Sequence, residues 1–222
     1  MKKGIFICFI GIDGSGKSTL AKTLIERMND QGITMEYKWC KFESSVFKIF
    51  IFIKNVLFIR ESNWKKNFEK SKVVKGNLFK NRYIAAIYEC FIFFDYRLQI
   101  IRKVTIPLIF GKNIVCDRYI YDTVVDISID LNYSDEKLKK RIEQLLDFSS
   151  KPNLVFWVDL PEDVAFSRKK DVPSINFLQE KRNLYKKIGT EFDVIVLDGT
   201  KNLQKLNEMV EEYSIKVINK KV

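Results

Sequence analysis

Residues 11–18 contain the strongest chemical signal in this 222-residue sequence, because they read Gly-Ile-Asp-Gly-Ser-Gly-Lys-Ser and fit the pattern G-x-x-x-x-G-K-[ST]. In such a loop the glycines let the backbone curl until successive N–H groups point at phosphate oxygens, and the following helix adds the positive end of its dipole. The lysine reaches the transferring phosphates, and the hydroxyl after it can ligate Mg²⁺. The loop predicts a site for ATP and Mg²⁺, formed by Gly11, Asp13, Gly14, Ser15, Gly16, Lys17, Ser18 and Thr19.

A second cluster of functional side chains, Asp117-Arg118-Tyr119, directly follows an apolar run that is predicted to be a strand. Ligands of open parallel sheets bind beyond the carboxyl ends of the strands, so Asp117 and Arg118 should project toward the phosphate loop. The carboxylate can hold Mg²⁺ or accept a proton, and the arginine can bridge two phosphate groups. We predict Lys17, Asp117 and Arg118 as catalytic residues and Ser18 and Asp117 as metal ligands.

The elements that position these residues follow from the alternation of short apolar runs with helical patterns, which is typical of crossover units and a parallel sheet. The run 5–10 is continuous and rich in β-branched and aromatic residues, as in a strand buried on both faces. Leu20, Leu24 and Met28 recur at helical spacing in 17–30. The predicted fold class is α/β, with a parallel sheet covered by helices on both faces. We expect its strands at 5–10, 33–39, 113–116, 154–158 and 194–197.

The residue types present limit the available chemistry. The sequence has no histidine, which excludes histidine zinc sites, Ser-His-Asp triads and histidine general bases. Its four cysteines form no C-x-x-C motif, so we expect reduced thiols in a cytoplasmic protein. No apolar run reaches the roughly 18 residues of a membrane span, and 1–10 reads better as a buried strand than as a signal peptide. Carboxylates, Lys, Arg and backbone amides remain for catalysis.

The middle of the chain is basic and aromatic. Of the formal net charge of +11, residues 35–112 contribute +10, from 16 Lys or Arg against 6 Asp or Glu. The stretch 44–99 is also rich in phenylalanine and is predicted to be largely helical. Either its helices pack on the sheet with lysine stems over apolar surface, or it faces an anionic partner such as a phosphorylated substrate, nucleic acid or an acidic membrane. Charge alone does not decide between these alternatives.

The sequence resembles the thymidylate kinase family over essentially its whole length. The resemblance rests on 9–19, which read Phe-Ile-Gly-Ile-Asp-Gly-Ser-Gly-Lys-Ser-Thr, on Asp117-Arg118-Tyr119, on 152–160 and on Asp198-Gly199 after the last predicted strand. It implies the fold of P-loop nucleoside monophosphate kinases, with about five parallel strands, and it implies a homodimer.

The same resemblance implies how the chain is organised. We expect a single domain over 1–222, with a basic, aromatic-rich helical segment on the substrate side at about 42–105 and a short lid at about 168–175. The Phe-rich helices of the substrate-side segment would supply the apolar face of the dimer.

The resemblance also implies roles for single residues in binding a small nucleotide substrate. Asp13 would contact the sugar hydroxyl of the acceptor, and Arg118 would bind the acceptor phosphate. Arg97 matches the family's base-contacting arginine, and Arg168 would lie against the adenine of ATP. The predicted substrate-binding residues are Asp13, Lys41, Arg97, Arg118, Tyr119 and Asp122, of which Lys41 matches a phosphate-binding arginine only loosely.

Three departures from the family pattern bear on the acceptor. Gly14 occupies the position of a catalytic arginine in some members, and the lid that provides an arginine in other members is short here, with Lys169 and Lys170 in its place. A lysine cannot reproduce the bidentate contacts of an arginine. After Tyr119, the serine, alanine and tyrosine of the family are replaced by Asp122, Val125 and Asp126. These departures leave thymine specificity open.

Three hypotheses for the function follow. The first is an ATP- and Mg²⁺-dependent kinase that phosphorylates a nucleoside monophosphate, with dTMP as the leading acceptor. The second keeps the kinase chemistry but takes a nucleoside or another small hydroxyl compound as acceptor, and Asp117 would then act as the base. The third is a nucleotide-binding module whose basic middle docks on nucleic acid or an anionic membrane.

Overall fold

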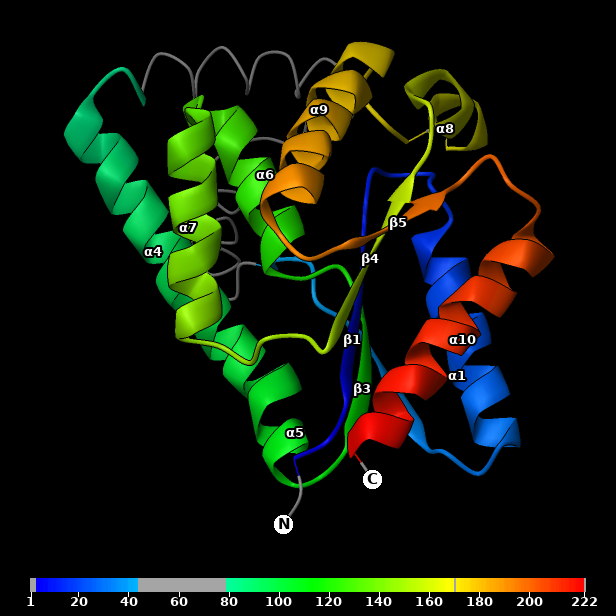
Figure 1. Ribbon diagram of the computed structural model, residues 1–222. Coiled ribbons are helices and arrows are strands. Elements are labelled where there is room, and N and C mark those ends of the chain that lie inside the picture. Colours follow the sequence, from blue (N-terminus) through cyan, green and yellow to red (C-terminus); the bar gives the residue numbers. More distant parts are fainter. Residues whose placement is uncertain (1–2, 44–78, 170, 222) are drawn as a thin grey trace, which may run out of the picture.

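The computed structural model describes residues 3–43, 79–169 and 171–221, which form a five-stranded, all-parallel sheet with helices on both faces (Figure 1). The strand order is β2-β3-β1-β4-β5, so β1 lies at the centre. The predicted α/β class is confirmed, and every predicted strand is found with each end at most two residues from the predicted position.

The elements are β1 Phe6–Ile10, α1 Lys17–Asp30, β2 Met35–Trp39, α4 Arg82–Ile100, η1 Ile101–Thr105, α5 Ile106–Ile109, β3 Asn113–Asp117, α6 Ile120–Leu131, α7 Asp135–Asp147, β4 Leu154–Asp159, α8 Glu162–Arg168, α9 Ile175–Glu191, β5 Ile195–Asp198 and α10 Leu203–Lys221.

The register of the sheet brings the chemical residues to one edge. Strand β1 is buried along its whole length, as its apolar sequence predicts. Phe9 lies opposite Asp117 of β3 on one side and opposite Phe156 of β4 on the other. Because all strands run in the same direction, the phosphate loop after β1 and the Asp117-Arg118 segment after β3 leave the sheet at the same carboxyl edge.

Two helical layers enclose the sheet. Helices α1 and α10 cover one face, and α4, α6, α7 and α9 lie on the other (Figure 1). On the first face Leu20, Leu24 and Met28 of α1 pack with Leu206 and Val210 of α10. The helical spacing of the apolar residues in α1 therefore reflects its contact with the sheet, as predicted. The core on the second face includes Tyr96, Val124, Ile142, Leu178 and Tyr185.

Helix α4 confirms part of the predicted helical stretch. The rest of that stretch, residues 44–78, lies outside the described residues, and so does most of the basic Phe-rich segment. The π-helical turn Ile101–Thr105 joins α4 to α5. Pro107 follows this turn and has no N–H to donate to the preceding turn, so a wider turn accommodates it. Among the helices that the structure describes, none is long and apolar enough to cross a membrane.

A buried ion pair fastens α4 to α7. Glu89 of α4 accepts hydrogen bonds from Nε and Nη2 of Arg141, both at 2.8 Å, and one from the hydroxyl of Tyr133. Burial raises the pKa of Glu89, but these donors outweigh it and hold the pKa below the usual value of a glutamate. The charged form of Glu89 therefore stabilises the docked position of α4.

We expect Glu89→Gln to lower the free energy of unfolding by about 2–3 kcal/mol at pH 7, because it removes charge-assisted hydrogen bonds. A carboxylate with a lowered pKa contributes stability above its unfolded pKa and loses that contribution as the pH falls through its folded pKa. The difference between wild type and variant in urea unfolding should thus be full at pH 7 and shrink below about pH 4. Glu212→Gln, which removes an exposed pair with Lys216, should leave the urea midpoint unchanged. If Glu89→Gln lowered the free energy of unfolding equally at pH 7 and below about pH 4, this account would be contradicted.

Candidate active site

The phosphate loop adopts a backbone that only glycine tolerates at two positions. Gly11 has a φ of 139°, and a Cβ there would lie 2.7 Å from the carbonyl oxygen of Val158. Gly14 has a φ of 86°, and its Cβ would lie 2.5 Å from the carbonyl oxygen of Ala165. The packing of the loop against β4 and α8 therefore excludes at Gly14 the arginine that some family members carry. The hydroxyl of Ser15 is buried in this curl and has no hydrogen-bond partner among the described residues.

Lys17 begins α1 and is buried beneath the phosphate loop. Its ammonium donates a hydrogen bond of 2.9 Å to the carbonyl oxygen of Ile12. Burial, and after it the positive charge of Arg118, lower the pKa of Lys17 to about 7. A polyphosphate in the loop would supply the negative charge that favours the protonated form. The side chain is therefore placed to gain a strong partner when a phosphate group arrives.

Asp117 lies at the carboxyl end of β3, next to the start of α1. Its Oδ2 accepts hydrogen bonds from the hydroxyl of Ser18 and, at 2.9 Å, from the hydroxyl of Tyr37. Its Oδ1 is buried and has no hydrogen-bond partner in the described part of the chain. A hydroxyl beside a carboxylate with an unpartnered oxygen is a hard oxygen donor set, which fits Mg²⁺. The two residues predicted as metal ligands are thus brought together by the fold.

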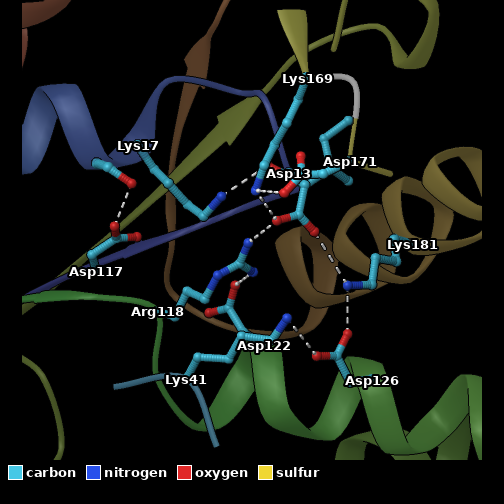
Figure 2. Close-up of polar contacts among 12 residues, drawn as sticks. Asp13, Lys17, Lys41, Asp117, Arg118, Asp122, Asp126, Lys169, Asp171 and Lys181 are labelled. Carbon is cyan, nitrogen blue, oxygen red and sulfur yellow. Dashed lines mark hydrogen bonds and ion pairs between the residues drawn. The ribbon is translucent and has the colours of Figure 1, made fainter. Parts of the chain in front are cut away.

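Arg118 has a φ of 70°, which is rare for a residue with a side chain, and its guanidinium is buried between two carboxylates. Nη2 donates to Oδ1 of Asp13 at 2.6 Å, and Nη1 donates to Oδ1 of Asp122 at 3.0 Å (Figure 2). Burial opposes the charge of Arg118, but these carboxylates outweigh it and keep its pKa above the usual value. Burial likewise opposes the charge of Asp13, while Arg118 and nearby lysines hold the pKa of Asp13 well below its usual range. Both groups are ionised at neutral pH.

One cavity of about 690 Å³ collects most of the predicted site residues at the carboxyl edge of the sheet. Its walls come from the phosphate loop, the start of α1, the ends of β2 and β3, and the segment after α8. The predicted residues that line it are Asp13, Gly14, Ser15, Gly16, Lys17, Ser18, Thr19, Lys41, Asp117, Arg118 and Arg168. Sequence positions more than 150 residues apart therefore form one polar, mostly cationic site.

The far end of the cavity was not predicted. Gly199, Lys201 and Leu203 line it after β5, beside Arg168 of α8. The backbone of Gly199 lies close to the end of β4, since a Cβ at Gly199 would lie 2.9 Å from the carbonyl oxygen of Asp159. The Asp-Gly pair after the last strand was the available signal, because it marks a tight turn at the same edge of the sheet.

Two predicted substrate-binding residues lie away from the cavity. Arg97 is exposed on α4, where its guanidinium lies 4.7 Å from the ring centre of Phe148, and it does not line the cavity. Tyr119 is fully buried in the core, and its hydroxyl donates to the carbonyl oxygen of Ser150 at 2.8 Å. The first side chain points to another helix, and the second is enclosed by the sheet and α6. Both substrate-binding assignments stay predictions, because no substrate contact is described for either residue.

Asp122, the third predicted substrate-binding residue outside the cavity lining, contacts Arg118 inside the protein. Its carboxylate accepts hydrogen bonds from Arg118, from the backbone N–H of Tyr119 at 3.1 Å and from the hydroxyl of Tyr185 at 2.7 Å. It is fully buried and does not line the cavity. Asp122 therefore holds the guanidinium of Arg118 in place, and its predicted contact with substrate stays a prediction.

Two lysines complete the charged surroundings of Asp13. Lys169 lies 3.4 Å from Oδ1 of Asp13, so one lysine of the predicted lid reaches the site, whereas Lys170 lies outside the described residues. Lys181 of α9, which the sequence analysis did not single out, lies 3.6 Å from Oδ2 of Asp13 and 2.5 Å from Asp126 (Figure 2). A lysine at a buried position of a helix was the signal that could have revealed it.

The comparisons with known proteins agree with this geometry. Thymidylate kinase from Leptospira interrogans serogroup Icterohaemorrhagiae serovar copenhageni is 29% identical over 221 residues, covering 95% of this chain and 92% of the relative. The thymidylate kinase of Leptospira borgpetersenii is 27% identical over 231 residues, covering 100% and 98%. That of Buchnera aphidicola subsp. Baizongia pistaciae is 25% identical over 233 residues, covering 99% and 98%. No family model matches the chain.

The similarity extends along nearly the full length of both chains and includes the phosphate loop and the β3 tip that form the cavity. The sheet is five-stranded and all-parallel, as the fold of P-loop nucleoside monophosphate kinases requires. The chain is therefore thymidylate kinase-like in its sequence and has this fold, and its relatives support a nucleotide kinase.

Proposed function

We propose that this kinase transfers the γ-phosphoryl group of ATP to a nucleoside monophosphate, with dTMP as the acceptor and Mg²⁺ as the cofactor. The observation that carries the proposal is one cavity lined by Lys17, by the bonded pair Ser18–Asp117 and by Arg118. Lys17 and Ser18 suit the donor phosphates, and Arg118 suits an acceptor phosphate beside them. The name shared by the relatives supports dTMP as the acceptor.

In the proposed reaction an oxygen of the acceptor phosphate attacks the γ-phosphorus of ATP. The bond from this phosphorus to the β–γ bridging oxygen breaks, and ADP leaves. The acceptor phosphate is already ionised, so no protein group has to remove a proton from it. Lys17 and Arg118 offset the charge of the reacting groups, and the loop amides orient them. Mg²⁺ held by Ser18 and Asp117 would offset charge on the donor phosphates.

The remaining contacts are proposed from position and charge. The ionised carboxylate of Asp13 is the proposed acceptor of a hydrogen bond from the sugar hydroxyl, and Lys41 is a proposed contact for the acceptor phosphate. Arg168 at the far end of the cavity is the proposed contact for adenine. The proposal includes a homodimer, for which the exposed apolar side chains of α4 are available.

A second acceptor class is favoured by two observations. Asp13 and Asp122 already neutralise Arg118, and Oδ1 of Asp117 has no hydrogen-bond partner among the described residues. A site of this kind also suits a neutral acceptor whose hydroxyl would give its proton to Asp117 as the oxygen attacks the γ-phosphorus. Thymidine is the simplest acceptor of this second class.

A panel of acceptors with ATP labelled at the γ-phosphorus tests the proposal. We expect Mg²⁺-dependent transfer of label to dTMP, weaker or no transfer to AMP, GMP and CMP, and none to thymidine. Transfer to another monophosphate in preference to dTMP would keep the reaction and overturn the thymine assignment. Label on thymidine but not on dTMP would establish the second acceptor class. An absence of transfer to every member of the panel would refute the proposed function.

A further inference from the structure

An alternating chain of charges runs beside the cavity, and two of its members, Arg118 and Asp13, line the cavity (Figure 2). We define it as the charge chain Asp122, Arg118, Asp13, Lys181 and Asp126. Its consecutive distances are 3.0, 2.6, 3.6 and 2.5 Å. Its members come from the tip of β3, the phosphate loop, α6 and α9. The position of each group therefore depends on the groups beside it.

Lys181 is the unusual member of the charge chain. Its side chain is only 2% exposed, and it comes from α9, which contributes no other residue to the charge chain. A buried ammonium is costly unless nearby groups compensate it. Here Asp126 lies 2.5 Å away, Asp13 lies 3.6 Å away, and the ring centre of Phe177 lies 4.9 Å away. An ion pair with Asp126 alone would suffice to fasten α9 to α6.

The contact of Lys181 with Asp13 has a different consequence, because each oxygen of the Asp13 carboxylate then faces a different cation. Oδ1 of Asp13 accepts from Arg118, and Oδ2 faces Lys181. A carboxylate with both oxygens available tends to bind a guanidinium through two parallel hydrogen bonds. In this structure Arg118 is hydrogen-bonded to only one oxygen of Asp13, and Lys181 faces the other oxygen.

We propose that Lys181 is a positioning residue, which retains Asp13 on the phosphate-loop side and so leaves Arg118 able to exchange Asp13 for the acceptor phosphate. The inference rests on the proposed function, because it assumes that Arg118 receives that phosphate. When the phosphate displaces Asp13 from Nη2, Lys181 and Lys169 continue to compensate the carboxylate. Without Lys181, Asp13 closes on Arg118 with both oxygens and competes with the acceptor.

The two double variants of the test keep the net charge. Lys181→Met/Asp126→Asn removes Lys181 together with its partner carboxylate. Asp126→Asn alone removes the ion pairs of Asp126 with Lys181 and, at 3.8 Å, with Lys41, but keeps Lys181 beside Asp13. Both variants lose the contact with Lys41, so the difference between them isolates Lys181. The matched control is Lys187→Met/Asp135→Asn, which removes an exposed pair of the same 2.5 Å length between α9 and α7. Lys181→Arg is the conservative variant. Steady-state kinetics are measured with the best acceptor of the panel, and thermal unfolding is recorded for each protein.

We expect Lys181→Met/Asp126→Asn to raise the KM of the acceptor about 10–100-fold while kcat changes less than about threefold, since the lost effect concerns binding in the ground and transition states alike. The KM for ATP should change less than about threefold. Asp126→Asn and the control pair should keep the acceptor KM within about threefold of wild type, and Lys181→Arg should restore most of the affinity. If Asp126→Asn raised the acceptor KM as much as the double variant does, the inference would be overturned, because the ion pair would then be merely structural.

A crystal structure of Lys181→Met/Asp126→Asn separates this inference from the proposed function. We expect both oxygens of Asp13 to bind Arg118 in the variant and only one in the wild type. An unchanged Asp13 would overturn the inference even if dTMP is phosphorylated. If wild type phosphorylates no monophosphate, the proposed function fails, and the position of Asp13 in these crystals still decides whether Lys181 divides its oxygens.

Discussion

Lys17→Met is expected to reduce kcat about a thousandfold or more, because the ammonium is the one cation of the phosphate loop that reaches the transferring group. The variant should fold as well as the wild type. Burial lowers the pKa of Lys17 to about 7, so the folded protein gains nothing from its charge in the absence of phosphates. Methionine is similar in length and leaves no unpaired charge. Between about pH 7 and 10 the variant should therefore be equally or more resistant to heat.

The measurement combines kcat with dTMP, or with the best acceptor of the panel, and thermal unfolding across this pH range. Lys22→Met is the matched control, since Lys22 is an exposed lysine on the same helix, and it should keep kcat near the wild-type value. Turnover by Lys17→Met within tenfold of wild type would remove Lys17 from the catalytic residues. A lower melting temperature would show that its buried charge stabilises the fold.

Arg118→Ala is expected to have the second large effect, on stability and on function together. It leaves the fully buried Asp122 without its cation, and breaking a buried pair in this way typically costs about 3–5 kcal/mol. Burial already raises the pKa of Asp122, and Arg118 opposes that rise. Without Arg118 the folded protein should take up a proton at Asp122, so the destabilisation should be larger at pH 8 than at pH 5.

Arg118→Lys separates the catalytic role of Arg118 from its structural role. Lysine keeps the positive charge but cannot bind Asp13 and Asp122 through the two ends of a planar fork. We expect this variant to stay folded and to raise the acceptor KM about 100-fold. Urea unfolding at two pH values and steady-state kinetics provide the measurements. Wild-type kinetics in Arg118→Lys, or a pH-independent stability loss in Arg118→Ala, would contradict this account of Arg118.

The predicted elements that proved correct are those with strong local signals. The run 5–10 is apolar throughout, and a strand of this kind is stable only at the centre of a covered sheet. Helix α1 begins at Lys17, directly after the loop, and ends at Asp30, as predicted. The loop and the residues after β3 meet because parallel strands end at the same edge, which is a property of the topology and needs no knowledge of side-chain positions.

The sequence did not reveal the direction of the side chain for three of the predicted substrate-binding residues. Tyr119 and Asp122 follow Arg118 in the sequence, yet one fills the core and the other holds Arg118 from behind. Arg97 lies on the surface of α4, near Phe148. A one-residue step along a strand or half a turn of a helix changes the face that a side chain occupies, and nearness in sequence does not reveal this direction.

The sequence by itself therefore determined the α/β architecture, the phosphate loop and the pair Asp117-Arg118, because these depend on short patterns of polarity, glycine and charge. Only the tertiary structure decided that Lys181, from the distant helix α9, stands between Asp13 and Asp126. The physical reason is that a buried charge is tolerated only where opposite charges from other elements surround it. That arrangement arises when the helices pack, and it leaves no pattern in neighbouring residues.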